Sequence, residues 1–267
     1  MLPPRVIIYG PSKIGISTFC SKIPNAYFLD VGRTIGHIYP EPGRRCSFMW
    51  EVNDSLSMIT SGEIKCKFLV IDNLYGLENL VMNSVCTKGG MPQDGYFEDI
   101  PYGKGPGMVI EELKRFLYTL DTIVAQNKIG IVITANEFIE QRNMAHGPVT
   151  FSRPNMITKS TKAQTILEEA YTILTNWADC TLYASLENQV GGQFFGTNSY
   201  HELNKDPQDR CLYTERRPTF EAGNRYGLEY KLPFEWSALE KGIQKYFDEK
   251  LKSNDNNVLE KTDEECV

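Results

Sequence analysis

The N-terminal part of the chain reads Arg5-Val6-Ile7-Ile8-Tyr9-Gly10-Pro11-Ser12-Lys13-Ile14-Gly15-Ile16-Ser17-Thr18. Its first five residues form a short, mostly apolar run, which is typical of a β-strand buried on both faces. The next eight residues, 10–17, match the phosphate-binding pattern G-x-x-x-x-G-K-[ST] at every fixed position except one, because Ile16 stands in place of the lysine. This stretch predicts a strand, a phosphate-binding loop (P-loop) and a helix that begins near Ser17.

The P-loop is expected to hold the phosphates of a nucleotide. Its two glycines let backbone N–H groups turn inward around phosphate oxygens, and Ser17 is placed to bind Mg²⁺. Lys13 lies inside the loop, and we expect it to replace part of the missing lysine charge. The alternative at this point is a tight strand-to-helix turn that binds nothing. The predicted nucleotide-binding residues are Gly10, Pro11, Ser12, Lys13, Ile14, Gly15, Ile16, Ser17 and Thr18.

A second apolar run ends in a carboxylate and reads Phe68-Leu69-Val70-Ile71-Asp72. Because open α/β sheets bind ligands at the carboxyl ends of their strands, Asp72 is predicted to bind Mg²⁺ together with Ser17, as in a Walker B motif. Taken alone, Asp72 fits equally well as the N-cap of the next helix. The order of the two motifs along the chain favours the metal role, so ATP and Mg²⁺ are the expected cofactors.

The remaining apolar patterns predict an α/β fold. Three further short apolar runs, at 26–30, 129–134 and 181–184, indicate a mostly parallel sheet buried on both faces. Apolar residues recur at three- and four-residue steps over 109–124, and further helices are expected at 161–177 and 236–251. Strands that alternate with helices predict a sheet flanked by helices, with right-handed crossovers.

Other segments are predicted to be irregular or β-rich. Six glycines and three prolines in 89–107 favour a long ordered loop near the ligand-binding edge of the sheet. Residues 141–154 are also expected to be irregular, and 193–215 to form a β-hairpin-type extension. We expect a single domain over residues 1–252, followed by a disordered acidic tail over 253–267.

Composition excludes several classes of protein. Hydrophobic residues make up 41% of the chain and charged residues 23%, as in ordinary globular proteins. No apolar run reaches the roughly 20 residues needed to cross a bilayer, so we expect a cytoplasmic protein without a membrane partner. The seven cysteines form no CxxC pair, and the histidines show no metal-ligand spacing. A net charge of −6 argues against a generally basic surface but leaves a local basic groove open.

Several separated motifs together show a family resemblance. They are Ile8-Tyr9-Gly10-Pro11, Phe28-Leu29-Asp30, Val70-Ile71-Asp72, Tyr102-Gly103-Lys104-Gly105, Trp177-Ala178-Asp179, Thr214-Glu215-Arg216-Arg217-Pro218 and Asn224-Arg225-Tyr226-Gly227-Leu228. The chain resembles the phage and prophage AAA-class, RecA-like nucleotide-binding proteins of the single-strand annealing and recombination ATPase family. The resemblance implies a RecA-like P-loop NTPase core with a β-rich C-terminal extension. It also implies a homo-oligomer, single-stranded DNA as a partner, and the host cytoplasm if the gene belongs to a phage.

Three positions depart from that family's pattern, and all three concern hydrolysis. Ile16 replaces the loop lysine, Gly32 stands where a glutamate is usual, and Asn136 stands where a histidine is usual. Asn136 can still hydrogen-bond a γ-phosphate oxygen, whereas Gly32 cannot act as a base. Asp30 is either a substitute for that base or a satisfied carboxylate at a strand end. The sequence therefore leaves open whether this P-loop ATPase-like protein hydrolyses ATP.

Basic residues outside the loop are further candidates. The resemblance implies that Arg216, Arg217 or Arg225 contacts the γ-phosphate bound by a neighbouring subunit, and surface ion pairing is the alternative. Lys159 and Lys162 are candidate DNA-phosphate contacts or simply solvated residues at a helix start. The predicted catalytic residues are Asp72, Asn136, Arg216 and Arg217, and the predicted metal ligands are Ser17 and Asp72.

These patterns predict a protein that binds ATP and Mg²⁺ and assists DNA recombination or single-strand annealing, with slow or impaired hydrolysis. Nucleotide binding follows from the residues, and the DNA role follows from the resemblance alone. A pseudo-NTPase that serves as a protein-interaction scaffold is the alternative. A small-molecule kinase is disfavoured because the sequence shows no clear acceptor-site carboxylate or lid motif.

Overall fold

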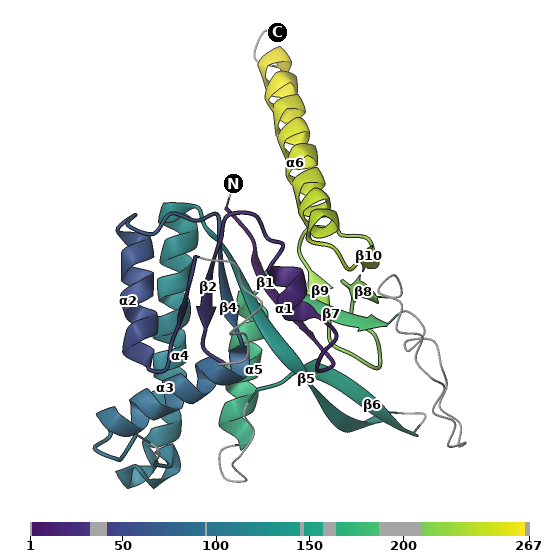
Figure 1. Ribbon diagram of the computed structural model, residues 1–267. Coiled ribbons are helices and arrows are strands. Elements are labelled where there is room, and N and C mark those ends of the chain that lie inside the picture. Colours follow the sequence, from purple (N-terminus) through teal and green to yellow (C-terminus); the bar gives the residue numbers. More distant parts are fainter. Residues whose placement is uncertain are drawn as a thin grey trace.

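The computed structural model describes residues 2–32, 42–93, 95–144, 147–156, 164–186 and 210–264 (Figure 1). Its strands are β1 (Arg5–Gly10), β2 (Ala26–Asp30), β3 (Gly43–Arg45), β4 (Phe68–Asp72), β5 (Gly130–Met144), β6 (Gly147–Pro154), β7 (Cys180–Leu186), β8 (Arg210–Tyr213), β9 (Gly223–Asn224) and β10 (Lys231–Pro233). Its α-helices are α1 (Ile16–Cys20), α2 (Met49–Thr60), α3 (Leu74–Lys88), α4 (Gly105–Thr122), α5 (Gln164–Trp177) and α6 (Trp236–Glu264). Short 3₁₀ turns at Phe97–Asp99 and Pro101–Gly103 precede α4, and a π-helical turn at Ile123–Asn127 follows it.

The centre of the sheet is parallel. In the order β3-β2-β4-β5-β1-β7, each strand runs parallel to its neighbour. Strands β8 and β9 pair antiparallel with β7, and β10 pairs antiparallel with β8. The predicted α/β fold with a mostly parallel sheet, flanked by helices and extended by short C-terminal strands, is confirmed.

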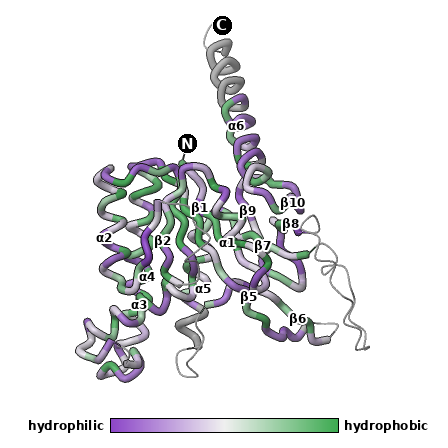
Figure 2. The backbone as a smooth tube through the Cα atoms, in the orientation of Figure 1, coloured by the Kyte–Doolittle hydropathy of each residue, from purple (hydrophilic) through white to green (hydrophobic). Residues whose placement is uncertain are grey.

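Helices cover both faces of this sheet. Successive residues of a strand point to opposite faces. Ile7 and Ile131 accordingly belong to the apolar cluster that contains residues of α2, α3, α4 and α5, whereas Val6 and Val132 belong to the cluster that contains residues of α1 and α6. Figure 2 shows the hydrophobic residues concentrated along the central strands. Burial on both faces explains why these strands are continuous apolar runs in the sequence.

Residues 141–154 are not irregular, and the prediction for them was wrong. Strand β5 continues to Met144 and forms an antiparallel hairpin with β6. Cross-strand contacts stabilise this pairing, because Arg153 Nε donates to Glu140 Oε2 at 2.9 Å and the Arg142 guanidinium lies 3.4 Å from the centre of the Phe151 ring. Such pairs form only when the two segments meet, so the hairpin was not evident from either segment alone.

The segment 89–107 is more ordered than a single long loop. It contains two 3₁₀ turns, and α4 already begins at Gly105. A side chain on Gly105 would collide with the backbone oxygen of Phe97, so this glycine permits a close approach instead of breaking the helix. Figure 1 places the segment at the free ends of α3 and α4, away from α1.

The C-terminal helix is longer than predicted. Helix α6 continues to Glu264, past residue 252, where we expected a disordered tail to begin. The segment 253–264 contains no glycine or proline, and the weak helix formers at 253–257 do not end the helix. Residues 265–267 lie outside the described residues, as does 193–209 of the predicted β-hairpin-type extension.

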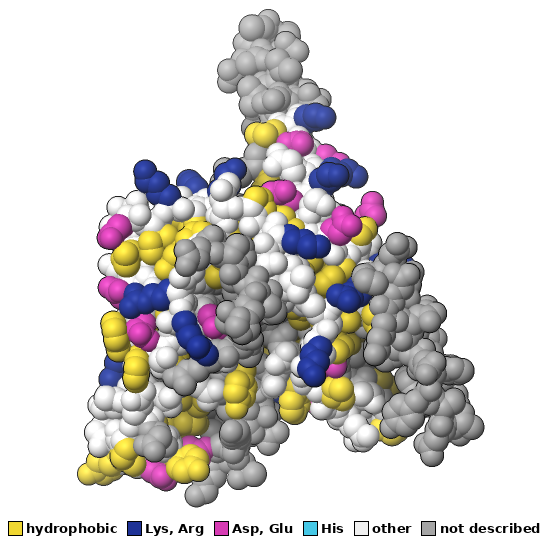
Figure 3. Space-filling view, in the orientation of Figure 1, with side chains coloured by type: hydrophobic (Ala, Val, Ile, Leu, Met, Phe, Trp, Pro, Cys, Tyr) yellow, Lys and Arg dark blue, Asp and Glu magenta, His cyan; other side chains and the backbone are white. Residues whose placement is uncertain are grey.

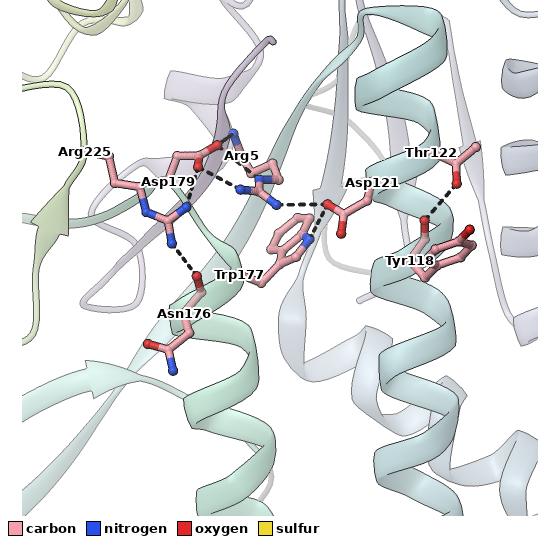
Figure 4. Close-up of polar contacts among 8 residues, drawn as sticks. All are labelled: Arg5, Tyr118, Asp121, Thr122, Asn176, Trp177, Asp179 and Arg225. Carbon is pink, nitrogen blue, oxygen red and sulfur yellow. Dashed lines mark hydrogen bonds and ion pairs between the residues drawn. The ribbon is translucent and has the colours of Figure 1, made fainter.

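An ion-pair network fastens the start of β1 to neighbouring elements (Figure 4). The Arg5 guanidinium donates to Asp179 at 2.9 and 3.1 Å and to Asp121 at 2.9 Å, and Trp177 Nε1 donates to Asp121 at 2.8 Å. Burial alone would raise the pKa of Asp179, but hydrogen bonds from Arg5 and the positive charges of Arg5 and Arg225 together hold this pKa below its usual value. Arg225 Nη1 also donates to Asp179 at 2.9 Å, so this candidate finger is already engaged within its own chain.

Candidate nucleotide-binding site

The P-loop connects β1 to α1, and its backbone geometry requires both glycines. A side chain on Gly10 would collide with the backbone oxygen of Ala184 on β7. Gly15 has a φ of 104°, in the left-handed region that favours glycine. Within the loop, the Ile14 N–H donates to the Pro11 carbonyl oxygen at 3.1 Å. The loop therefore forms a defined turn at the carboxyl end of β1.

The two predicted metal ligands lie in contact. Ser17 Oγ donates to Asp72 Oδ2 at 2.8 Å, and Asp72 is 2% exposed. Adjacent oxygen ligands of an octahedral Mg²⁺, bound at about 2.0–2.1 Å, lie about 2.9 Å apart. The oxygens of Ser17 and Asp72 thus suit a Mg²⁺ ion. The N-cap of α3 is Asn73, whose Oδ1 accepts from the Gly76 N–H at 2.9 Å, so the alternative role of Asp72 as that cap is wrong.

The P-loop borders a cavity of about 380 Å³. Its size falls within the roughly 300–1,000 Å³ typical of small-molecule sites. It is lined by Pro11, Ser12, Lys13, Ile14, Gly15, Ile16, Ser17, Thr18, Asp72, Asn73, Thr134, Ala135 and Asn136. Asn136 lies opposite Gly10 in the pairing of β5 with β1, so the structure brings it to the loop as the sequence predicts.

Thr134 is a cavity residue that the sequence analysis missed. It is 3% exposed, and its Oγ1 has no hydrogen-bond partner within the described part of the chain. An unpaired buried hydroxyl costs free energy, which a hydrogen bond to a ligand oxygen or to a ligand-bound water would recover. Its only signal in the sequence is a polar residue at the end of an apolar run, which many strands share.

Ile16 and Lys13 occupy very different surroundings. Ile16 is 8% exposed and packs with Phe19 and Trp236 in the apolar cluster that includes residues of α1 and α6. Lys13 is exposed, lines the cavity and has a φ of 67°, a strained conformation for a residue other than glycine. The positive charge that the loop itself offers to a ligand therefore comes from Lys13.

The position of the missing glutamate is crowded. A side chain on Gly32 would begin 3.0 Å from Asn73 Oδ1, the atom that caps α3. Asp30 lies next to Asp72 across strands β2 and β4, and its carboxylate is 3.9 Å from Arg45. Asp30 thus agrees better with a paired carboxylate at a strand end than with a free base.

The structure does not bring the predicted arginine fingers to the cavity of their own chain. Arg216 is exposed, with its Nε 3.8 Å from Glu221, and the guanidinium carbon of Arg217 lies 4.0 Å from the centre of the Tyr230 ring. A contact with phosphate would therefore have to come from a second chain. The candidate DNA contacts Lys159 and Lys162 and the histidines His37, His146 and His201 lie outside the described residues.

The described cysteines give no support for thiol chemistry at this site. The cysteines of the described residues are free and at least partly buried. Burial, together with the nearby charge of Asp72, raises the pKa of the Cys20 thiol well above its usual value, so it stays protonated. Within the described ranges, no cluster of three or more His, Cys, Asp or Glu residues could hold a metal ion, and no helix has the length and apolar character to cross a membrane.

Comparison with known families and structures adds two findings. Residues 2–226 match a protein family described as an AAA domain. A solved structure described as "Crystal structure of the RadB recombinase" is similar over 87% of this chain and 88% of that chain, with 14% sequence identity and a TM-score of 0.44. Comparison with curated proteins found no match.

Proposed function

The chain belongs to the AAA domain family, and we propose that it binds ATP together with Mg²⁺ at the P-loop. We further propose that it assists DNA recombination or single-strand annealing, as in the phage-type proteins it resembles, and that it hydrolyses ATP slowly. Nucleotide binding rests mainly on the 2.8 Å contact between Ser17 and Asp72 beside the glycine loop. Hydroxyl and carboxylate oxygens are the ligands that Mg²⁺ prefers, and the cavity beside them has room for a small molecule.

Slow hydrolysis is supported by two positions. Ile16 occupies the position of the lysine that stabilises negative charge on the transferred phosphoryl group, and its side chain belongs to an apolar cluster. Gly32 carries no group that could orient the attacking water, and the Asn73 cap fills the adjacent space. The same two positions favour the alternative, a scaffold that has lost nucleotide chemistry altogether.

The DNA part of the proposal has less support. On the face drawn in Figure 3, lysine and arginine side chains are dispersed among acidic ones instead of forming one basic patch. Nucleic-acid binding is usually accompanied by clustered positive charge. Single-stranded DNA is therefore proposed from the family resemblance alone.

ATP binding measured with and without Mg²⁺ tests the first part. We expect Mg²⁺ to tighten ATP binding to the wild-type protein, and Asp72→Asn to remove most of that effect while leaving the fold intact. Asp54→Asn is the matched control, because Asp54 is half exposed on α2 and pairs with Arg44 away from the cavity. Absence of ATP binding under both conditions would favour the scaffold.

Turnover and DNA binding form a second experiment. We expect single-stranded DNA to strengthen ATP binding, because two ligands that favour one state must reinforce each other. Turnover should stay slow with or without DNA. Fast hydrolysis by the wild-type protein would contradict the impaired-loop interpretation, and lack of any DNA binding or DNA effect would remove the recombination role while leaving nucleotide binding in place.

A further inference from the structure

Arg210 lies at the same edge of the sheet as the P-loop. It is the first residue of β8 and pairs with Leu186, the last residue of β7. Because β7 runs parallel to β1, the carboxyl end of β7 lies at the edge where β1 leads into the loop. Figure 1 shows β7 and β8 beside α1. Arg210 thus approaches the loop from the side opposite β4 and β5.

The Arg210 guanidinium packs against the loop backbone. A methyl group built on Gly15 would lie 2.7 Å from Arg210 Nη1 and 3.8 Å from its Cζ, and 3.8 Å from Cε1 of Phe234. The absence of a side chain on Gly15, whose φ of 104° itself favours glycine, lets the guanidinium come this close. The guanidinium therefore lies beside the residue that immediately precedes Ile16, the position where the lysine is missing.

No carboxylate within the described residues lies within 4.0 Å of the Arg210 guanidinium. Most other described arginines have such a partner, for example Arg5 with Asp179 at 2.9 Å and Arg153 with Glu140 at 2.9 Å. Arg210 is half buried, so its charge is less well hydrated than that of a fully exposed arginine. A half-buried guanidinium beside a phosphate-binding loop favours an anionic ligand as its partner.

We propose that Arg210 binds a phosphate group of the nucleotide from the β8 side of the loop, and so supplies in the same chain part of the charge that Ile16 cannot. Lys13 lines the cavity, whereas Arg210 contacts the loop from outside it, so the two cations would approach the polyphosphate from different directions. The planar guanidinium suits this role because two of its N–H groups can donate to one phosphate. This inference rests on the proposed nucleotide-binding function.

Binding of three probes to Arg210 variants tests the inference. The probes are ATP, inorganic tripolyphosphate and adenosine, and the variants are Arg210→Gln, which keeps a polar side chain without the charge, and Arg210→Lys. We expect Arg210→Gln to weaken ATP and tripolyphosphate binding by about 10- to 100-fold and to leave adenosine binding unchanged, with Arg210→Lys intermediate. Arg115→Gln is the matched control, because Arg115 is 72% exposed on α4. Thermal unfolding without ligand verifies that each variant folds.

The outcomes separate the inference from the function on which it rests. If wild-type protein binds ATP and folded Arg210→Gln binds it equally well, the inference is wrong and nucleotide binding stands. Weaker adenosine binding with unchanged tripolyphosphate binding would place Arg210 at the nucleobase and also overturn the inference. If wild-type protein binds neither ATP nor tripolyphosphate, the proposed function fails and the inference fails with it.

Discussion

Replacing Ile16 by lysine measures what the missing P-loop charge costs this protein. Ile16 has two roles in the structure, because it packs in the apolar cluster that includes residues of α1 and α6 and also lines the cavity. Lysine at this position would weaken the packing in the apolar cluster and would add a contact with phosphate in the cavity. The two effects can be separated, because only the second depends on ATP.

The magnitudes follow from burial and from hydrogen bonding. Fully burying an isoleucine side chain contributes about 1.5–3 kcal/mol, and the methylene stem of lysine can retain part of this, so we expect a loss of roughly 1–2 kcal/mol without nucleotide. A charge-assisted hydrogen bond contributes about 1.5–3 kcal/mol, which corresponds to roughly 10- to 100-fold tighter ATP binding. At saturating ATP, a tenfold gain in affinity restores about 1.4 kcal/mol of stability.

The assay is unfolding with and without Mg²⁺-ATP, together with ATP affinity and turnover. Ile16→Lys should be less stable than wild type alone but gain more stability from ATP, and turnover should recover only in part because Gly32 still provides no base. Ile16→Met is the control, since it changes the packing without adding charge. A folded Ile16→Lys protein with unchanged ATP affinity would refute the reasoning, and Lys13→Ala would then reveal whether Lys13 already fills the phosphate contact.

Three further predictions concern single side chains. Thr134→Val removes the unpaired buried hydroxyl, so it should stabilise the free protein by up to about 1 kcal/mol in urea unfolding and weaken ATP binding several-fold. A loss of stability without a change in ATP binding would contradict this prediction. Asp179→Asn should lower stability at pH 7 by roughly 1–3 kcal/mol. The folded-state pKa of Asp179 is depressed, so its contribution to the free energy of unfolding is present above about pH 4 and is lost as the pH falls through the folded-state pKa. The stabilities of wild type and variant should therefore converge in acid. A stability difference that does not change with pH would show that the effect does not come from the charge. Arg217→Ala removes an exposed contact with Tyr230 that contributes about 0.5–1 kcal/mol, so it should affect assembly or activity more than the melting temperature of the monomer. If a drop in melting temperature that is independent of protein concentration explained the whole loss of activity, Arg217 would have no finger role.

The sequence predicts the parallel centre of the sheet well because the signal there is local. Strand β4, for example, is buried on both faces, so its residues 68–71 are all apolar before the carboxylate of Asp72, and this pattern is readable without knowing the neighbouring strands. Helix α2 and strand β3 were not predicted, and helix α3 was expected only as a helix after Asp72, without bounds. In α3, Gly76 disfavours a helix by itself, yet the backbone of Val31 approaches so closely that only glycine fits.

For the candidate site, the sequence by itself determined the glycine loop, Ser17, Asp72 and the absence of a lysine at position 16, because these depend on spacing along one segment and on residues at strand ends. Only the tertiary structure decided which side chains meet there. Thr134 faces the cavity because β5 lies between β1 and β4, and Arg210 reaches Gly15 because β8 folds back along β7. Contacts between residues nearly 200 positions apart leave no periodic trace in the sequence, since each segment is also compatible with many other neighbours.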